Sequence, residues 1–190
     1  MIHSLKYKGI IFYLLVFQFL GCKKKEIYSS IPLIEYKNAI FYSASDGTDS
    51  VMTLIFTFKD GDGDIGLDQG DTNAPFQAIR DKYNRPTNPY YNNLHVDYYE
   101  WMDTSFQMVV KDLDPDATPP VYDTLRYLYR IENITPEGRH KAIRGDIEVQ
   151  VFPSPHPDAM DTVQYSFYIY DRALHQSNVA LSPALVWKRQ

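Results

Sequence analysis

The chain has 190 residues, of which 44% are hydrophobic and 23% charged, and it includes 16 Tyr, 10 Phe and 2 Trp. This composition suits one folded domain with a sizeable core, and it excludes a disordered tail and a multi-span membrane protein. The net charge of −5 leaves no basic surplus to hold a phosphate backbone, so nucleic acid is not an expected partner.

The first 21 residues have the pattern of an export signal. Lys6 and Lys8 precede an apolar stretch, residues 10–20, which is shorter than the roughly 20 apolar residues that cross a bilayer. A charged start, a short apolar centre and a small residue before the cut are typical of a secretory signal. The sequence therefore predicts a signal peptide over residues 1–21.

The end of this signal contains the only cysteine of the chain. Phe19-Leu20-Gly21-Cys22 resembles the lipobox of bacterial lipoproteins, with Phe19 where that motif usually has Leu. The resemblance implies that diacylglycerol is attached to the Cys22 thiol, that cleavage follows Gly21, and that the new amino group is acylated. The alternative is a free or buried Cys22 thiol behind an ordinary cleaved signal.

Residues 22–30 are expected to form the lipidated cysteine and a tether, and residues 31–190 are expected to form the folded domain. Lys23 follows the cysteine, whereas well-studied lipoproteins retained in the inner membrane carry Asp at this position. This resemblance implies attachment to the outer membrane through the N-terminal lipid. Both the periplasmic and the surface face of that membrane stay open.

The mature chain shows period-two alternation and aromatic or β-branched runs, without a sustained helical period. Residues 51–59 are the clearest case, because Met52, Leu54, Phe56 and Phe58 form one apolar face. The other expected strands are residues 34–42, 94–101, 106–110, 125–131, 143–152, 163–170 and 179–187. Turn-forming segments separate them, including a stiff Pro-containing loop over residues 112–120. About seven or eight strands at this spacing predict an immunoglobulin-like antiparallel β-sandwich.

Five aspartates lie in a short Gly-rich stretch directly after the strand expected at residues 51–59. Asp60, Asp62, Asp64, Asp68 and Asp71 occupy positions 1, 3, 5, 9 and 12 of this stretch. Hard cations such as Ca²⁺ take about six to eight oxygen ligands, and Gly between alternating Asp residues lets a loop turn inward. The sequence predicts a structural Ca²⁺ site with the first three aspartates as main ligands and Asp171 as a further candidate. The alternative is a solvated turn in which the Asp side chains cap backbone N–H groups.

Three stretches of the chain carry a wider resemblance. They are residues 58–66, which contain the Asp-Gly-Asp-Gly-Asp-Ile-Gly run, residues 129–147, and residues 168–178. Together they resemble a group of Bacteroidetes lipoproteins with an immunoglobulin-like sandwich. The resemblance implies a fold and an outer-membrane location, and it carries no reaction.

Aromatic residues gather in and after the longest irregular segment, residues 72–91, where one short helical turn is expected near residues 76–80. Tyr83, Tyr90, Tyr91 and Trp101 lie here among several Asn residues. Rigid aromatic rings mixed with adaptable amides are typical of recognition surfaces, so these four residues are predicted to bind a protein or glycan partner. The alternative is that these rings belong to the sheet surface and the core, since Tyr is a good strand former.

No catalytic motif is visible in the sequence. There is no nucleophile motif, and the histidines lack the spacing of a metal-ligand set. The sequence therefore favours a non-enzymatic binding or accessory module of the cell envelope. The alternative is a glycan- or peptide-directed hydrolase whose site is built from distant acidic residues.

Overall fold

The computed structural model describes residues 27–135, 142–154 and 158–189. The predicted signal peptide, Cys22 and Lys23 lie outside these ranges. The described residues form eleven strands and no helix, so the predicted all-β class is confirmed. Within the same ranges, no helix is long and apolar enough to cross a membrane.

The first sheet has three antiparallel strands in the order β1-β2-β8. Its strands are β1 (Leu33–Ser43), β2 (Asp49–Asp60) and β8 (Ile143–Val151). The apolar face predicted for β2 is confirmed, because Met52, Leu54 and Phe56 are fully buried and Phe58 is 5% exposed. Thr53 and Ile55 on its other face are buried as well. β2 is therefore the central strand, and its apolar face forms one half of the core.

The second sheet is centred on β3 (Leu94–Met102) and β9 (Thr162–Ile169). The short strands β4 (Ser105–Met108) and β7 (Arg126–Tyr129) both pair with β3, while β10 (Ala180–Leu181) and β11 (Leu185–Val186) pair with β9. The structure divides the single strand predicted over residues 179–187 into β10 and β11. Pro183 lies between them, and proline has no N–H to donate to a ladder.

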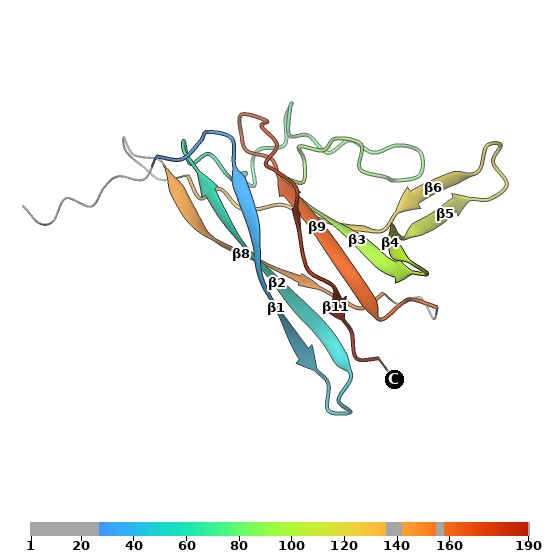
Figure 1. Ribbon diagram of the computed structural model, residues 1–190. Helices are drawn as coiled ribbons and strands as arrows, with labels where there is room; N and C mark the ends of the chain where they lie inside the picture. Colours follow the sequence, from blue (N-terminus) through green and yellow to red (C-terminus); the bar gives the residue numbers. More distant parts are fainter. Residues whose placement is uncertain (1–26, 136–141, 155–157, 190) are drawn as a thin grey trace, which may run out of the picture.

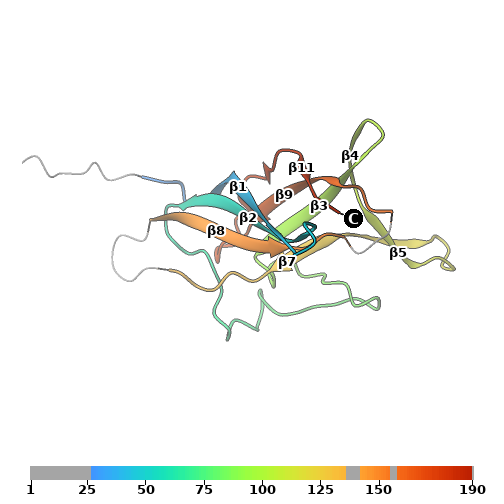
Figure 2. The same ribbon diagram turned by 90° about the horizontal axis from the view of Figure 1, so that it is seen from below.

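The two sheets pack face to face, as Figures 1 and 2 show from two directions. Phe56 of β2 stacks on Phe167 of β9, with ring centroids 4.8 Å apart. Near the C-terminus the buried Trp187 meets Phe41 edge to face, with centroids 5.4 Å apart. Burial of these apolar faces is the main stabilising term of such a fold, and the predicted antiparallel sandwich is confirmed.

Two sequence predictions differ from the structure. The stiff loop expected over residues 112–120 is confirmed for residues 115–120, but residues 112–114 belong to β5 (Val110–Asp114). This strand pairs with β6 (Val121–Thr124) in an arm that extends from the sandwich in Figure 1. Only the tip of this arm contains the prolines, where no ladder hydrogen bond is needed. The helical turn expected near residues 76–80 is absent, and the chain there is irregular after a turn at Ala74 and Pro75.

Several connections meet at one end of the sandwich, at the top of Figure 1. The segment that follows β2 makes an antiparallel bridge from Ile65 to Asp171, just after β9, and a parallel bridge from Leu67 to Glu132. Ile65 is fully buried and Leu67 is 3% exposed, so they close this end of the core. The aspartate-rich stretch is thereby fixed between the ends of both sheets.

Candidate metal centre

The first three aspartates of the Gly-rich stretch come together where β2 ends. Asp60, Asp62 and Asp64 each present one carboxylate oxygen, and these three oxygens lie within 4.8 Å of one another. Ca²⁺ binds oxygens at about 2.3–2.6 Å, so oxygens on opposite sides of the ion are up to about 5 Å apart. The spacing of the three oxygens therefore fits a shared cation of this size.

Glycine backbones shape the turn that brings the carboxylates together. A side chain at Gly61 would overlap the backbone carbonyl groups of Tyr28 and Ser29, and the Gly61 N–H donates to Ser29 O at 2.7 Å. Gly63 has a φ of 66°, which favours glycine over residues with a side chain. The Asp64 N–H donates to Asp60 Oδ2 at 3.0 Å, which closes the turn and leaves Asp60 Oδ1 without this partner.

The same residues carry polar atoms that the protein does not satisfy. Asp60 is fully buried, and Asp62 and Asp64 are half-buried. In each of the three, the Oδ1 atom is buried and has no hydrogen-bond partner in the described part of the chain. Buried polar atoms are nearly always hydrogen-bonded in native proteins, and an unpaired buried carboxylate is especially costly. Three carboxylates that come this close together and each carry an unpartnered buried oxygen are the feature that a cation would satisfy.

The protein environment works against the charged form of these groups. Burial, and next the repulsion from Asp62, raises the pKa of the Asp60 carboxyl to about 7. Burial and the neighbouring Asp171 also raise the pKa of Asp64. At a separation near 4.8 Å, each pair of unit charges repels by about 3 kcal/mol with an effective dielectric constant of about 20. A bound divalent cation would turn this repulsion into attraction.

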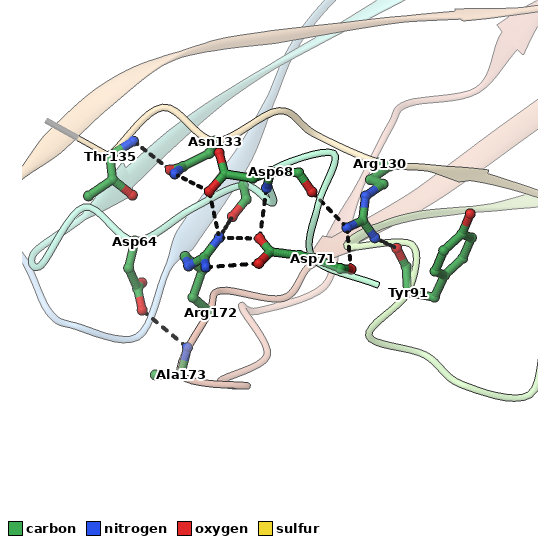
Figure 3. Close-up of polar contacts among 10 residues, drawn as sticks. Asp64, Asp68, Asp71, Tyr91, Arg130, Asn133, Thr135, Arg172 and Ala173 are labelled. Carbon is green, nitrogen blue, oxygen red and sulfur yellow. Dashed lines mark hydrogen bonds and ion pairs between the residues drawn. The ribbon is translucent and has the colours of Figure 1, made fainter. Parts of the chain in front are cut away.

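The remaining two predicted ligands are not brought into this cluster. Asp71 forms an ion pair with Arg172, with Nη1 and Oδ2 2.6 Å apart, and it also accepts from the Asp68 N–H at 2.8 Å (Figure 3). Asp68 is exposed and accepts from the Asn133 amide at 3.2 Å. The hydrogen bond from Arg172 lowers the pKa of Asp71. The structure thus gives Asp68 and Asp71 a cationic partner within the chain and places them beside the cluster.

Two arginines tie this neighbouring turn to distant parts of the chain. Arg130 donates to the backbone oxygens of Asp68 at 3.1 Å, Asp71 at 2.8 Å and Tyr91 at 2.6 Å (Figure 3). Arg172 follows β9, and its backbone N–H donates to Asp64 O at 3.1 Å. The Ala173 N–H donates to Asp64 Oδ2 at 3.1 Å. These contacts fasten both ends of the irregular segment to the sandwich.

Asp171, the further candidate ligand, lies next to the cluster with both carboxylate oxygens in use. Its side chain is fully buried, and it accepts from the His175 N–H at 2.7 Å and contacts His175 Nδ1 at 2.9 Å. The hydrogen bond to Asp171 raises the pKa of His175. Sequence reasoning did not identify Arg130, Arg172 or His175, because their partners are distant or depend on a turn that spacing does not reveal.

The four aromatic residues predicted to bind a partner each contact a different part of the chain. The Tyr83 hydroxyl donates to Asp114 of the arm at 3.0 Å, and the Tyr90 ring meets Tyr170 edge to face at 5.0 Å. The Tyr91 ring lies 5.1 Å from the Arg130 guanidinium, and Trp101, which is 43% exposed, packs on Phe106. Each of the four rings contacts a different neighbour, and their role in partner binding stays a prediction.

No protein-family model, curated protein or solved structure matches this chain. The assignment of the centre rests on its chemistry. Three carboxylates with no His or Cys among them form a hard, all-oxygen donor set, which suits Ca²⁺ and Mg²⁺ better than Zn²⁺ or Cu²⁺. Ca²⁺ tolerates irregular geometry, whereas Mg²⁺ demands a near-ideal octahedron. The three carboxylates could therefore hold a hard divalent cation such as Ca²⁺ or Mg²⁺.

Proposed function

We propose that this protein is a lipid-anchored, non-enzymatic binding module of the bacterial outer membrane, in which one Ca²⁺ ion fastens the loops at one end of the sandwich. The observation that carries the proposal is the cluster of Asp60, Asp62 and Asp64, whose carboxylates come within 4.8 Å of one another and each have a buried Oδ1 atom without a hydrogen-bond partner. The ion has a structural role here, because it joins the end of β2 to the turn after β9 through the contacts of Asp64.

The binding role is supported by how the long irregular segment is held. Arg130 fixes its two ends by donating to Asp68, Asp71 and Tyr91, and the Asn88 amide donates inside it to Pro75 O and Gln77 O at 2.7 Å each. Loops longer than about 12 residues without regular structure are usually functional or disordered, and this one has many internal bonds. A preorganised surface loop loses less entropy when it binds a partner.

The membrane attachment is supported by the sequence at Phe19-Leu20-Gly21-Cys22 and by the resemblance to Bacteroidetes lipoproteins. Several acyl chains at Cys22 would give an anchor much stronger than a single chain, since each buried methylene contributes about 0.8 kcal/mol. Part of the predicted tether already contacts the domain, because Ser29 O accepts the Gly61 N–H. The tether from the lipidated cysteine would therefore join the domain beside the aspartate cluster.

Thermal unfolding tests the metal part of the proposal. The chain from Ile27 onward carries all the described strands, and its melting temperature would be measured in excess Ca²⁺, in excess Mg²⁺ and in chelator. At a Ca²⁺ concentration about 100 times Kd, binding stabilises the folded state by about 2.7 kcal/mol, which raises the melting temperature by about 5 to 10 °C. Mg²⁺ is expected to give a smaller rise. Equal melting temperatures in Ca²⁺ and in chelator would rule out the site.

A further inference from the structure

A groove of about 670 Å³ lies on the outer side of the second sheet. One wall is formed by residues 81, 85–89 and 92, in and just after the irregular segment, and the other by the arm of β5 and β6, which contributes Lys111 and Thr124. The floor includes His95 of β3 and Tyr168 of β9. Its volume is within the range of about 300 to 1,000 Å³ that is usual for sites that bind small ligands.

The walls of this groove are held in place by contacts between distant residues. Arg85 binds Asp81 Oδ2 at 2.6 Å and donates to Tyr122 O of the arm at 3.1 Å. His95 Nε2 lies 2.9 Å from Pro89 O, and the His95 ring stacks on Tyr168 with centroids 4.8 Å apart. The groove is therefore a preformed feature that joins three separate parts of the chain.

The charges that line the groove largely cancel within the protein. Arg85 is paired with Asp81, and Arg126 hydrogen-bonds Thr124 and lies 3.9 Å from Asp97. A ligand with a high net charge would find no uncompensated cluster of the opposite sign here. This arrangement favours a neutral ligand.

Several polar side chains that line the groove have no hydrogen-bond or ion-pair partner within the described part of the chain. Across the described residues, the side chains of Thr87, Asn92 and Lys111 make no hydrogen bond or ion pair, although all three line the groove. Together they offer a hydroxyl, an amide and an ammonium group, and Pro86, Leu125 and Leu128 give the lining apolar surface. A sugar needs this combination, because its ring hydroxyls take hydrogen bonds and its C–H face packs on apolar surface.

A protein partner fits the groove less well. Protein interfaces depend on large, centrally placed apolar or aromatic anchors and bury about 800 Å² on each side. The exposed Trp101 and Tyr122 rings, which are 43% and 53% exposed, are not part of the lining. We propose that the groove binds a short neutral oligosaccharide. This inference rests on the proposed role of the protein as a binding module and names its ligand class.

Calorimetric titration with defined sugars tests this inference. The full-length protein, solubilised in detergent with Ca²⁺ present, would be titrated with the neutral tetrasaccharides of maltose, cellobiose, chitobiose, mannose and xylose type. At least one is expected to bind saturably, and the double variant Asn92→Ala/Lys111→Ala is expected to weaken that binding at least tenfold. The matched control is Asn38→Ala/Lys37→Ala on β1 of the other sheet, which should bind as the native protein does.

Two results would overturn the proposal. One is that none of the five sugars binds, and the other is that the groove variant binds as tightly as the control variant does. Thermal unfolding of each variant in Ca²⁺ and in chelator shows that it is folded and reports separately on the metal site. If the protein binds sugar but its melting temperature does not respond to Ca²⁺, the groove proposal stands and the metal proposal fails. If the melting temperature responds to Ca²⁺ but no sugar binds, only the metal proposal stands.

Discussion

Asp62 is the aspartate of the cluster whose charge can be removed with least structural damage. Asp60 and Asp64 each accept a backbone hydrogen bond through Oδ2, whereas the described part of the chain forms none with the Asp62 side chain. We expect Asp62→Asn to change the melting temperature in opposite directions with and without Ca²⁺. In chelator the variant should melt above the native protein, since it relieves repulsion on Asp60. In Ca²⁺ it should melt below the native protein, since it removes a ligand. Melting curves of both proteins in both solutions check this crossing, and a variant that is less stable in both would contradict it.

Gly66 is required where the aspartate-rich stretch crosses the segment that follows β7. It has a φ of 100°, and a Cβ atom there would overlap the backbone carbonyl of Glu132. Left-handed strain of about 1–2 kcal/mol and the displaced backbone together predict that Gly66→Ala lowers the free energy of unfolding by about 3 kcal/mol.

Gly47→Ala is the matched control for this substitution. Gly47 has a φ of 86° with nothing near its missing Cβ, so only the strain of about 1–2 kcal/mol applies. Urea unfolding of the two variants measures the difference. Equal losses would show that the contact with Glu132 does not limit this position.

At this scale the sequence predicts part of the centre and misses part of it. Alternating Asp and Gly directly after a strand are local features, so Asp60, Asp62 and Asp64 are identified correctly as neighbours. The places of Asp68 and Asp71 depend on Arg172, which is 101 residues away from Asp71. Spacing along the chain cannot show which carboxylates have an arginine partner in the fold.

His95 links two elements, because its buried side chain on β3 contacts Pro89 O of the irregular segment. Burial lowers the pKa of His95 below its ordinary value of 6.5. The folded state therefore binds its proton less readily than the unfolded state does. The contribution of neutral His95 to stability is complete above pH 6.5, and it is lost as the pH falls from there toward the lower folded pKa.

We expect the native protein to lose more stability than His95→Gln between pH 7.5 and pH 5.5 with Ca²⁺ present. Gln keeps an N–H that can donate to Pro89 O and has no charge to gain. Urea midpoints at a series of pH values give the comparison. Parallel pH profiles for the two proteins would show that His95 does not titrate in the way that its burial implies.

The strands differ in how well their sequences identify them. β2 and β9 are buried on the core face, and their alternation predicts them within a residue or two. No position of β5 or β6 is buried, so the pattern that marks a buried face is missing and the Pro-rich tip is the stronger signal. The arm forms because two segments pair, for example Val110 with Thr124. The sequence of either segment alone does not indicate this pairing.

At the scale of the whole molecule, the proposed lipid anchor determines where the sandwich works. Replacing Cys22 with Ser removes the only thiol that could accept diacylglycerol. We expect Cys22→Ser to leave the membrane fraction and to appear in a soluble fraction, while its Ca²⁺-dependent melting is unchanged. Cell fractionation after a high-salt wash measures this, and a variant that still sediments with membranes would argue against the anchor.

The central claim is that Asp60, Asp62 and Asp64 bind one Ca²⁺ ion, and calorimetric titration of Ca²⁺ into chelator-treated protein tests it most directly. We predict saturable binding of one ion per chain with Kd in or below the range of about 10⁻⁴–10⁻³ M typical of extracellular modules. Binding should be at least tenfold weaker in Asp62→Asn. The absence of saturable binding, or an isotherm that Asp62→Asn leaves unchanged, would contradict the claim.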